Sequence, residues 1–145
     1  MKKIVFAEDR AIVVKAIEIL LEAEFGNFQL AIAGDEDQLD KALQQHPSGL
    51  AIISTRVLAS DSVQSLLDIK EKYPRLDILI FSGPINRMYA HYLRQKGFKG
   101  HLQEGSSDSE IVTALNKVFE GHTYFPENPV REFNYERRIP VSVAS

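Results

Sequence analysis

Three short stretches of the chain, residues 4–7, 50–53 and 78–81, are apolar without interruption. A continuous apolar run, rather than an alternation of apolar and polar positions, is typical of a strand covered on both faces, as in a parallel sheet. Residues 28–33 and 100–103 are weaker candidates of the same kind. The pattern therefore predicts five strands.

Between these strands, apolar residues recur at the spacing of helices. The main stripes fall within residues 13–21, 63–67 and 111–119, and shorter helices are expected at 35–45 and 86–96, the latter presenting Met88, Tyr89, Tyr92 and Leu93. Ser107 and Glu110 have the spacing of a capping box, and Gly121 stands where the last helix is expected to end. Strands alternating with helices predict an α/β domain of three layers, with helices on both faces of a parallel sheet.

Composition narrows the class of protein. The chain has 145 residues, enough for one domain, and its 17 Lys and Arg against 20 Asp and Glu give a net charge of −3. That balance gives no support to a basic nucleic-acid-binding surface, and the absence of cysteine excludes disulfides and thiolate chemistry. No apolar run is long enough for a membrane span or a signal peptide, so we expect a soluble cytoplasmic protein. Residues 1–126 are expected to form the domain and residues 127–145 a tail or linker.

Polar residues follow the predicted strands at the positions where a parallel sheet binds its ligands, which is beyond the carboxyl ends of the strands. The candidates after the first, third, fourth and fifth strands are, in chain order, Glu8, Asp9, Ser54, Arg56, Ser82 and Glu104.

This arrangement resembles the receiver domain of bacterial two-component response regulators. The resemblance covers about residues 2–126 and rests on residues 4–9 (IVFAED), 50–56 (LAIISTR), 78–83 (ILIFSG) and 96–102 (KGFKGHL). Residues 119–126 (FEGHTYFP) are most similar to receivers that precede a helix-turn-helix output domain. The resemblance implies a flavodoxin-like (βα)5 fold, a doubly wound parallel sheet with strand order 2-1-3-4-5.

It also implies a chemistry that this sequence only partly retains. In the family, an aspartate after the third strand accepts a phosphoryl group, and an acidic pair after the first strand helps to hold Mg²⁺. A hydroxyl residue and a lysine after the fourth and fifth strands contact the phosphoryl oxygens, and an aromatic residue on the fifth strand moves inward with the hydroxyl. Glu8 and Asp9 match the acidic pair, and Ser82 matches the hydroxyl position.

The sequence departs from the family at three positions. Ser54 stands at the phosphoacceptor position, Glu104 at the lysine position and His101 at the aromatic switch position. A serine hydroxyl cannot form the labile acyl phosphate, and a carboxylate reverses the charge that would pair with the phosphoryl group. We therefore predict that aspartyl phosphorylation does not occur.

The acidic residues have two interpretations. Glu8 and Asp9 either bind a divalent cation weakly, Mg²⁺ or Ca²⁺, or are acidic residues at a helix N-terminus that complement the helix dipole. Glu104 either replaces the missing metal ligand or forms an ion pair with Arg56 across the pocket, which would lock the site closed.

The remaining candidates are also open to more than one interpretation. Ser54 is either a target of a serine kinase or a small polar residue at a strand end, and Ser82 is interpreted as a structural hydroxyl. His101 is either a pH-sensitive switch or, as is commoner on a short strand, a solvent-facing histidine.

The leading hypothesis is a degenerate receiver that signals through protein–protein contacts, is not an enzyme, needs no cofactor and contacts neither nucleic acid nor membrane directly. The resemblance implies a partner surface on the fourth helix, fifth strand and fifth helix, often used for homodimers, which here includes Tyr89, Tyr92 and His101. One alternative is the receiver part of a DNA-binding transcription regulator. A remote alternative is a small hydrolase that uses a metal held by the clustered carboxylates.

Overall fold

The computed structural model describes residues 1–59 and 62–126. The predicted tail at 127–145 lies outside these residues. The five strands are β1 (Lys2–Ala7), β2 (Phe28–Ala33), β3 (Leu50–Ser54), β4 (Asp77–Ser82) and β5 (Gly100–Gln103), and all neighbouring strands are parallel. Their order in the sheet is β2-β1-β3-β4-β5, which confirms the predicted fold and topology. The central strand β3 is buried along its whole length, as its uninterrupted apolar sequence requires.

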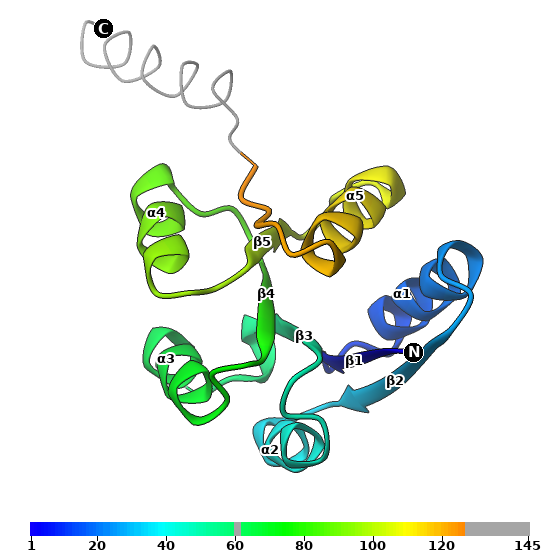
Figure 1. The fold of residues 1–145 in the computed structure, drawn as a ribbon, viewed down its shortest axis with the longest axis horizontal. Helices are drawn as coiled ribbons and strands as arrows, with labels where there is room; N and C mark the ends of the chain where they lie inside the picture. Colours follow the sequence, from blue (N-terminus) through cyan, green and yellow to red (C-terminus); the bar gives the residue numbers. More distant parts are fainter. Residues whose placement is uncertain (60–61, 127–145) are drawn as a thin grey trace, which may run out of the picture.

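Helices cover both faces of the sheet (Figure 1). On one face lie α1 (Ala11–Glu24) and α5 (Asp108–Phe119), and on the other lie α2 (Glu36–Gln45), α3 (Ser62–Lys72) and α4 (Arg87–Gln95). A short 3₁₀ helix, Thr55–Val57, follows β3. Each face of the sheet therefore has its own hydrophobic core, and the site lies at the edge where the strands end.

The helix starts follow from local hydrogen bonding. The side chain of Asp35 accepts a bond of 2.8 Å from the amide of Gln38, and Ser107 with Glu110 forms the predicted capping box. Gly121 follows α5 with a φ of 88°, a left-handed conformation that favours glycine.

Two of the predicted apolar stripes are only partly buried. On α1, Ile17 and Leu21 are buried but Ala16 is exposed, and on α4, Leu93 is buried whereas Met88 is 83% exposed. These helices have broader apolar faces than the sheet covers.

The chain after α5 returns to the open edge of β5. Tyr124 lies beside Gly100, and its carbonyl accepts a bond of 2.9 Å from the amide of His101 while its own amide donates one of 2.7 Å to Lys99. This segment protects an edge strand that would otherwise present unpaired backbone groups. Across 1–59 and 62–126, no helix has the length and apolar character that a membrane crossing requires.

Candidate functional site

Charged side chains from three strand ends meet at the carboxyl edge of the sheet. Ala7 pairs with Ile53, so Glu8 and Ser54 follow neighbouring positions of adjacent strands. Glu104 reaches the same edge from the end of β5. The structure thus brings together the acidic pair, the phosphoacceptor position and the lysine position, as the resemblance implies.

Glu8 is the buried centre of this cluster, with no exposed side-chain surface. Its Oε2 accepts hydrogen bonds from the amides of Asp9 and Arg10, at 2.9 and 3.0 Å, and from Arg10 Nε at 3.1 Å. Its Oε1 accepts a bond of 2.8 Å from Arg10 Nη2. A buried carboxylate is stable only when it is paired and hydrogen-bonded, and Glu8 is both.

Arg10 connects the two ends of the pocket. Besides its contacts with Glu8, its Nη1 donates a bond of 3.0 Å to Oε2 of Glu104. These two carboxylates raise the pKa of the Arg10 guanidinium, Glu8 contributing most. The side chain can reach both because Arg10 is the N-cap residue of α1, in extended conformation, directly after the strand end.

Arg56 pairs with Asp9, and the predicted ion pair between Arg56 and Glu104 is wrong. Arg56 Nε and Nη2 donate to the two carboxylate oxygens of Asp9 at 2.9 and 3.2 Å, and Nε lies 3.8 Å from Glu8. This fork lowers the pKa of Asp9 to about 2. Glu104 pairs with Arg10 instead, and Arg56 is engaged by both carboxylate oxygens of Asp9.

Ser54 is fully buried and its hydroxyl oxygen accepts a bond of 3.3 Å from the amide of Arg56. In this position it starts the 3₁₀ helix that carries Arg56 toward the pocket. The serine therefore has a structural role in the turn after β3.

His101 is buried, with 5% of its surface exposed, so the solvent-facing interpretation is wrong, as is its place on an exposed partner surface. Its Nε2 lies 2.8 Å from the hydroxyl oxygen of Ser82 and 3.1 Å from the carbonyl oxygen of Gly83. A carbonyl can only accept, so Nε2 carries the proton, and the Ser82 hydroxyl donates to Gly83 at 2.9 Å. Burial lowers the pKa of His101, and the neutral ring is favoured. Ser82 is a structural hydroxyl in this network.

The donor set does not fit the Mg²⁺ ion of the family. In the part of the chain that the structure describes, no group of three or more His, Asp and Glu side chains is placed to hold a metal ion. The oxygens of Glu8 and Asp9 that a metal would use already accept bonds from two guanidinium groups. Arg10 and Arg56 instead supply the positive charge that faces these two carboxylates.

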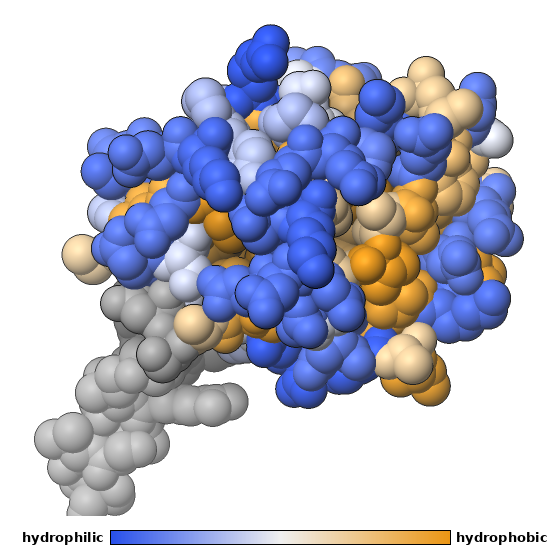
Figure 2. All heavy atoms as spheres, turned by 90° about the horizontal axis from the view of Figure 1, so that it is seen from below, coloured by the Kyte–Doolittle hydropathy of each residue, from blue (hydrophilic) through white to orange (hydrophobic). Residues whose placement is uncertain are grey.

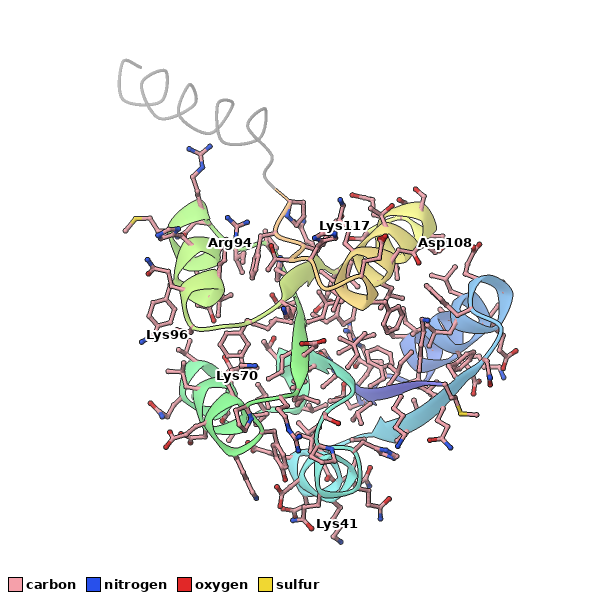
Figure 3. All side chains as sticks on the ribbon, viewed as in Figure 1. Lys41, Lys70, Arg94, Lys96, Asp108 and Lys117 are labelled. Atoms are coloured by element: carbon pink, nitrogen blue, oxygen red, sulfur yellow. The ribbon has the colours of Figure 1, made fainter. Side chains whose placement is uncertain are left out.

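The other aromatic candidates lie on α4. Tyr92 is 37% exposed, and Lys96 Nζ lies 5.5 Å from the centre of its ring. Tyr89 is half-buried against the core. Lys96 lies at the outer edge of the molecule (Figure 3). Of the residues predicted for the partner surface, Tyr92 is therefore the exposed one.

No protein-family model matches the chain. The oxygen regulatory protein NreC of Staphylococcus epidermidis is 26% identical over 123 residues, which are 84% of this chain and 56% of that protein. The chain thus spans just over half the length of the curated relatives it matches. The isolated receiver domain of RcsB from Salmonella enterica superposes with a TM-score of 0.77 at 19% identity, covering 90% of this chain and 96% of the other. The chain is therefore similar in sequence to a response regulator and has the fold of a response-regulator receiver domain.

Other solved receiver domains have the same fold. A LuxR-family DNA-binding response regulator of Silicibacter pomeroyi gives a TM-score of 0.65 at 14% identity, with 87% of this chain and 97% of that chain covered. Receiver domains of response regulators are, as a class, signalling domains rather than enzymes.

Arg10 is the functional residue that sequence reasoning missed. A cation directly after two strand-end carboxylates is a usable signal, because a buried glutamate needs a partner and the nearest one is two residues away. The sequence does not reveal that the same guanidinium also donates a hydrogen bond to Glu104, ninety-four residues later.

Proposed function

We propose that this receiver domain signals through protein–protein contacts without aspartyl phosphorylation and without Mg²⁺. The observation that supports this most is Arg10, whose guanidinium joins Glu8 to Glu104 across the pocket. In a phosphorylation site, a metal ion neutralises the acidic pair and a lysine neutralises the phosphoryl group. Here a side chain of the protein neutralises the acidic residue, and a second carboxylate takes the place of the lysine.

The acceptor position supports the same conclusion. Ser54 lacks a nearby base in its hydrogen bonds, since its hydroxyl oxygen accepts from the amide of Arg56. A serine with this environment is a weak nucleophile toward a phosphoryl group, and an ester on it would not have the lability of an acyl phosphate.

The surface of α4 is our candidate for the partner site. The segment from residue 78 to residue 103 contains Arg87, Arg94, Lys96 and Lys99 and no Asp or Glu. Met88 and Tyr92 are exposed on the same helix. Apolar and aromatic side chains surrounded by positive charge suit a partner that presents an acidic, partly apolar segment.

The proposal is tested by intact-protein mass after incubation with acetyl phosphate and Mg²⁺. We expect no added phosphoryl group on the natural chain. A variant with Ser54→Asp, Glu104→Lys and Arg10→Ser restores the acceptor, restores the lysine and frees Glu8, and it should gain one phosphoryl group. The matched control keeps Glu104→Lys and Arg10→Ser but has Ser54→Asn, which cannot form an acyl phosphate. Phosphorylation of the natural chain would overturn the proposal.

A second candidate function is the receiver part of a DNA-binding regulator. It is favoured by the likeness to RcsB, which has been solved as two dimers bound to two parallel DNAs, with a TM-score of 0.76. The test is whether the reading frame continues into a helix-turn-helix domain. If it does, the DNA affinity of the whole protein should be insensitive to acetyl phosphate.

A further inference from the structure

The two edges of the sheet differ. At one edge, the segment at Tyr124 pairs with β5 and bonds to its outer backbone groups. At the other edge, β2 pairs with β1, and among residues 1–59 and 62–126 no backbone segment pairs with its outer side. Figure 1 shows β2 as the last strand on its side of the sheet, and Figure 2 shows exposed apolar side chains on that side of the molecule. β2 is therefore an open edge strand.

The sequence of this edge lacks the features that keep edge strands from pairing. Natural edge strands are protected by charged residues, prolines or bulges. Residues 26–34 (GNFQLAIAG) contain no charged residue and no proline, and β2 pairs with β1 over six residues without a bulge. Ile32 on this strand is 41% exposed. An edge of this kind is a template on which another strand can pair.

The register with β1 determines which backbone groups of β2 are free. The carbonyl of Ala33 accepts a bond of 2.9 Å from the amide of Glu8, so the odd-numbered residues of β2 direct their N–H and C=O groups toward β1. Successive residues of a strand alternate in this direction. The N–H and C=O groups of Phe28, Leu30 and Ile32 therefore point away from the sheet, and no described residue bonds to them.

These three outward residues match a second copy of the same strand. In an antiparallel pair centred on Leu30, this residue lies opposite the partner's Leu30, and Phe28 lies opposite the partner's Ile32. Each of the three residue pairs exchanges two hydrogen bonds, so six bonds join the strands. Phe28 and Leu30 pack on the α1 side of the sheet, and Ile32 lies on the same side by alternation. A phenylalanine ring then covers each exposed isoleucine, which is a stabilising cross-strand contact.

Charge and topology favour this occupant. Residues 26–34 are uncharged in both copies, so no like charges face one another across the paired strands. Gly26 lies opposite the partner's Gly34, so no side chains collide at either end of the pairing. Because the segment at Tyr124 covers β5, an open chain of copies joined from β2 to β5 is blocked. Pairing β2 with β2 uses the open edge of both copies, and association ends at the dimer.

The size of this contact predicts a moderate affinity. The six residues of β2 span about 20 Å. A domain of three layers is about 30 Å thick, so each copy contributes about 600 Å². The total of about 1,200 Å² is at the lower end of specific protein interfaces, and we expect a Kd in the micromolar range.

We propose that the open edge of β2 is a homodimerisation surface whose occupant is β2 of a second copy of the chain, so that two five-stranded sheets join into one. The surface is separate from the charged pocket and from α4. The homodimer therefore does not depend on phosphorylation, and it leaves α4 open to a different partner.

Sedimentation equilibrium of the 145-residue chain tests the proposal by measuring the Kd of the dimer. Ile32→Lys should raise this Kd on the order of a hundredfold, because it places a charge opposite the partner's Phe28 twice in each dimer. Ile32→Pro should also raise it at least about tenfold, because it removes two of the six hydrogen bonds between the strands. The N–H group that this proline removes has no partner within one copy, and proline is tolerated at such edge positions.

Amide hydrogen exchange of the natural chain supplies a signature that a contact between helices would not give. The amides of Phe28, Leu30 and Ile32 should exchange more slowly as the concentration rises through the Kd. The amides of Gln29 and Ala31 already bond to β1, so their exchange rates should change little.

Two matched substitutions serve as controls. Ile19→Lys changes an isoleucine on α1 that is 56% exposed, and Met88→Lys changes the exposed face of α4; neither should alter the Kd. Circular dichroism confirms that each variant is folded. A natural chain that stays monomeric at every concentration, a dimer weakened by either control as much as by Ile32→Lys, or exchange at the three outward amides that does not depend on concentration would each overturn the proposal. None of these outcomes bears on the phosphorylation assay, so the two proposals fail separately.

Discussion

The buried carboxylate of Glu8 offers the most direct test of how the pocket is held together. Glu8→Gln keeps the shape of the side chain but removes its charge and replaces one acceptor oxygen with an NH₂ group. Oε2 accepts three N–H groups and must remain an oxygen, so the amide nitrogen has to take the place of Oε1. In the variant this nitrogen would face Arg10 Nη2, which is also a donor. The hydrogen bond of 2.8 Å that Arg10 Nη2 donates to Oε1 in the natural chain would therefore be lost.

The size of the effect follows from burial. Losing a hydrogen bond to a charged group costs about 1.5–3 kcal/mol, and removing one partner of a buried ion pair costs about 3–5 kcal/mol. The higher range assumes a stranded charge, but Arg10 is 30% exposed and keeps its bond to Glu104. We therefore expect Glu8→Gln to lower the free energy of unfolding by about 2 kcal/mol, and the Tm by about 6 °C in a chain of this length.

Glu104→Gln is the matched control. It makes the same chemical change against the same guanidinium, but the Glu104 side chain is 33% exposed, so water replaces the lost bond. Its free energy of unfolding should fall by no more than about 0.5 kcal/mol. Urea denaturation at neutral pH measures both variants, with an unchanged m-value as the check on two-state unfolding. Equal effects of the two substitutions would refute the argument that burial of Glu8 makes this pairing important.

Three further predictions concern pH and packing. Asp9 has a folded pKa of about 2, below its ordinary 3.8, so the stability that its pairing with Arg56 provides should be lost as the pH falls from about 4 to about 2. In acid denaturation, Asp9→Asn should remove this part of the pH dependence of the free energy of unfolding. The pKa of His101 is lowered from its ordinary 6.5, so the unfolded chain binds a proton first and the free energy of unfolding should fall as the pH is lowered through about 6.5; in urea titrations at several pH values His101→Gln should flatten that fall, and an unchanged slope would count against the prediction. Gly100→Ala would place a Cβ against the carbonyl of Tyr124 and should lower the free energy of unfolding by about 1–3 kcal/mol, with faster hydrogen exchange at the amide of Tyr124.

The fold was predictable because its signals are local. Uninterrupted apolar runs located the central strands, and the strands 28–33 and 100–103 were placed with the bounds that β2 and β5 have in the structure. The capping box at Ser107 was correct for the same reason, since both of its partners lie within one turn. Once five strands alternate with helices, right-handed crossovers leave few possible topologies.

The errors at the site come from contacts between distant residues. His101 was expected to face solvent because it stands on a short strand at the edge of the sheet. Its burial depends on Ser82 of the neighbouring strand and on Tyr124, which covers the open edge of β5. The pairing of Glu104 was missed likewise, because two arginines compete for three carboxylates and only the spatial arrangement decides between them.

The charge balance of the pocket connects its chemistry with the proposed function. Glu8, Asp9 and Glu104 contribute three negative charges, and Arg10 and Arg56 return two positive ones, all within hydrogen-bond contact. A receiver that works by phosphorylation needs an acidic pocket that stays incomplete until a metal ion and a phosphoryl group arrive, because their arrival is the signal. This pocket is nearly neutral without either, so a phosphoryl dianion would have to break existing ion pairs to enter. On the proposed function, the state of the domain is then set by what binds its surface, and its regulation depends on the concentration of its partner.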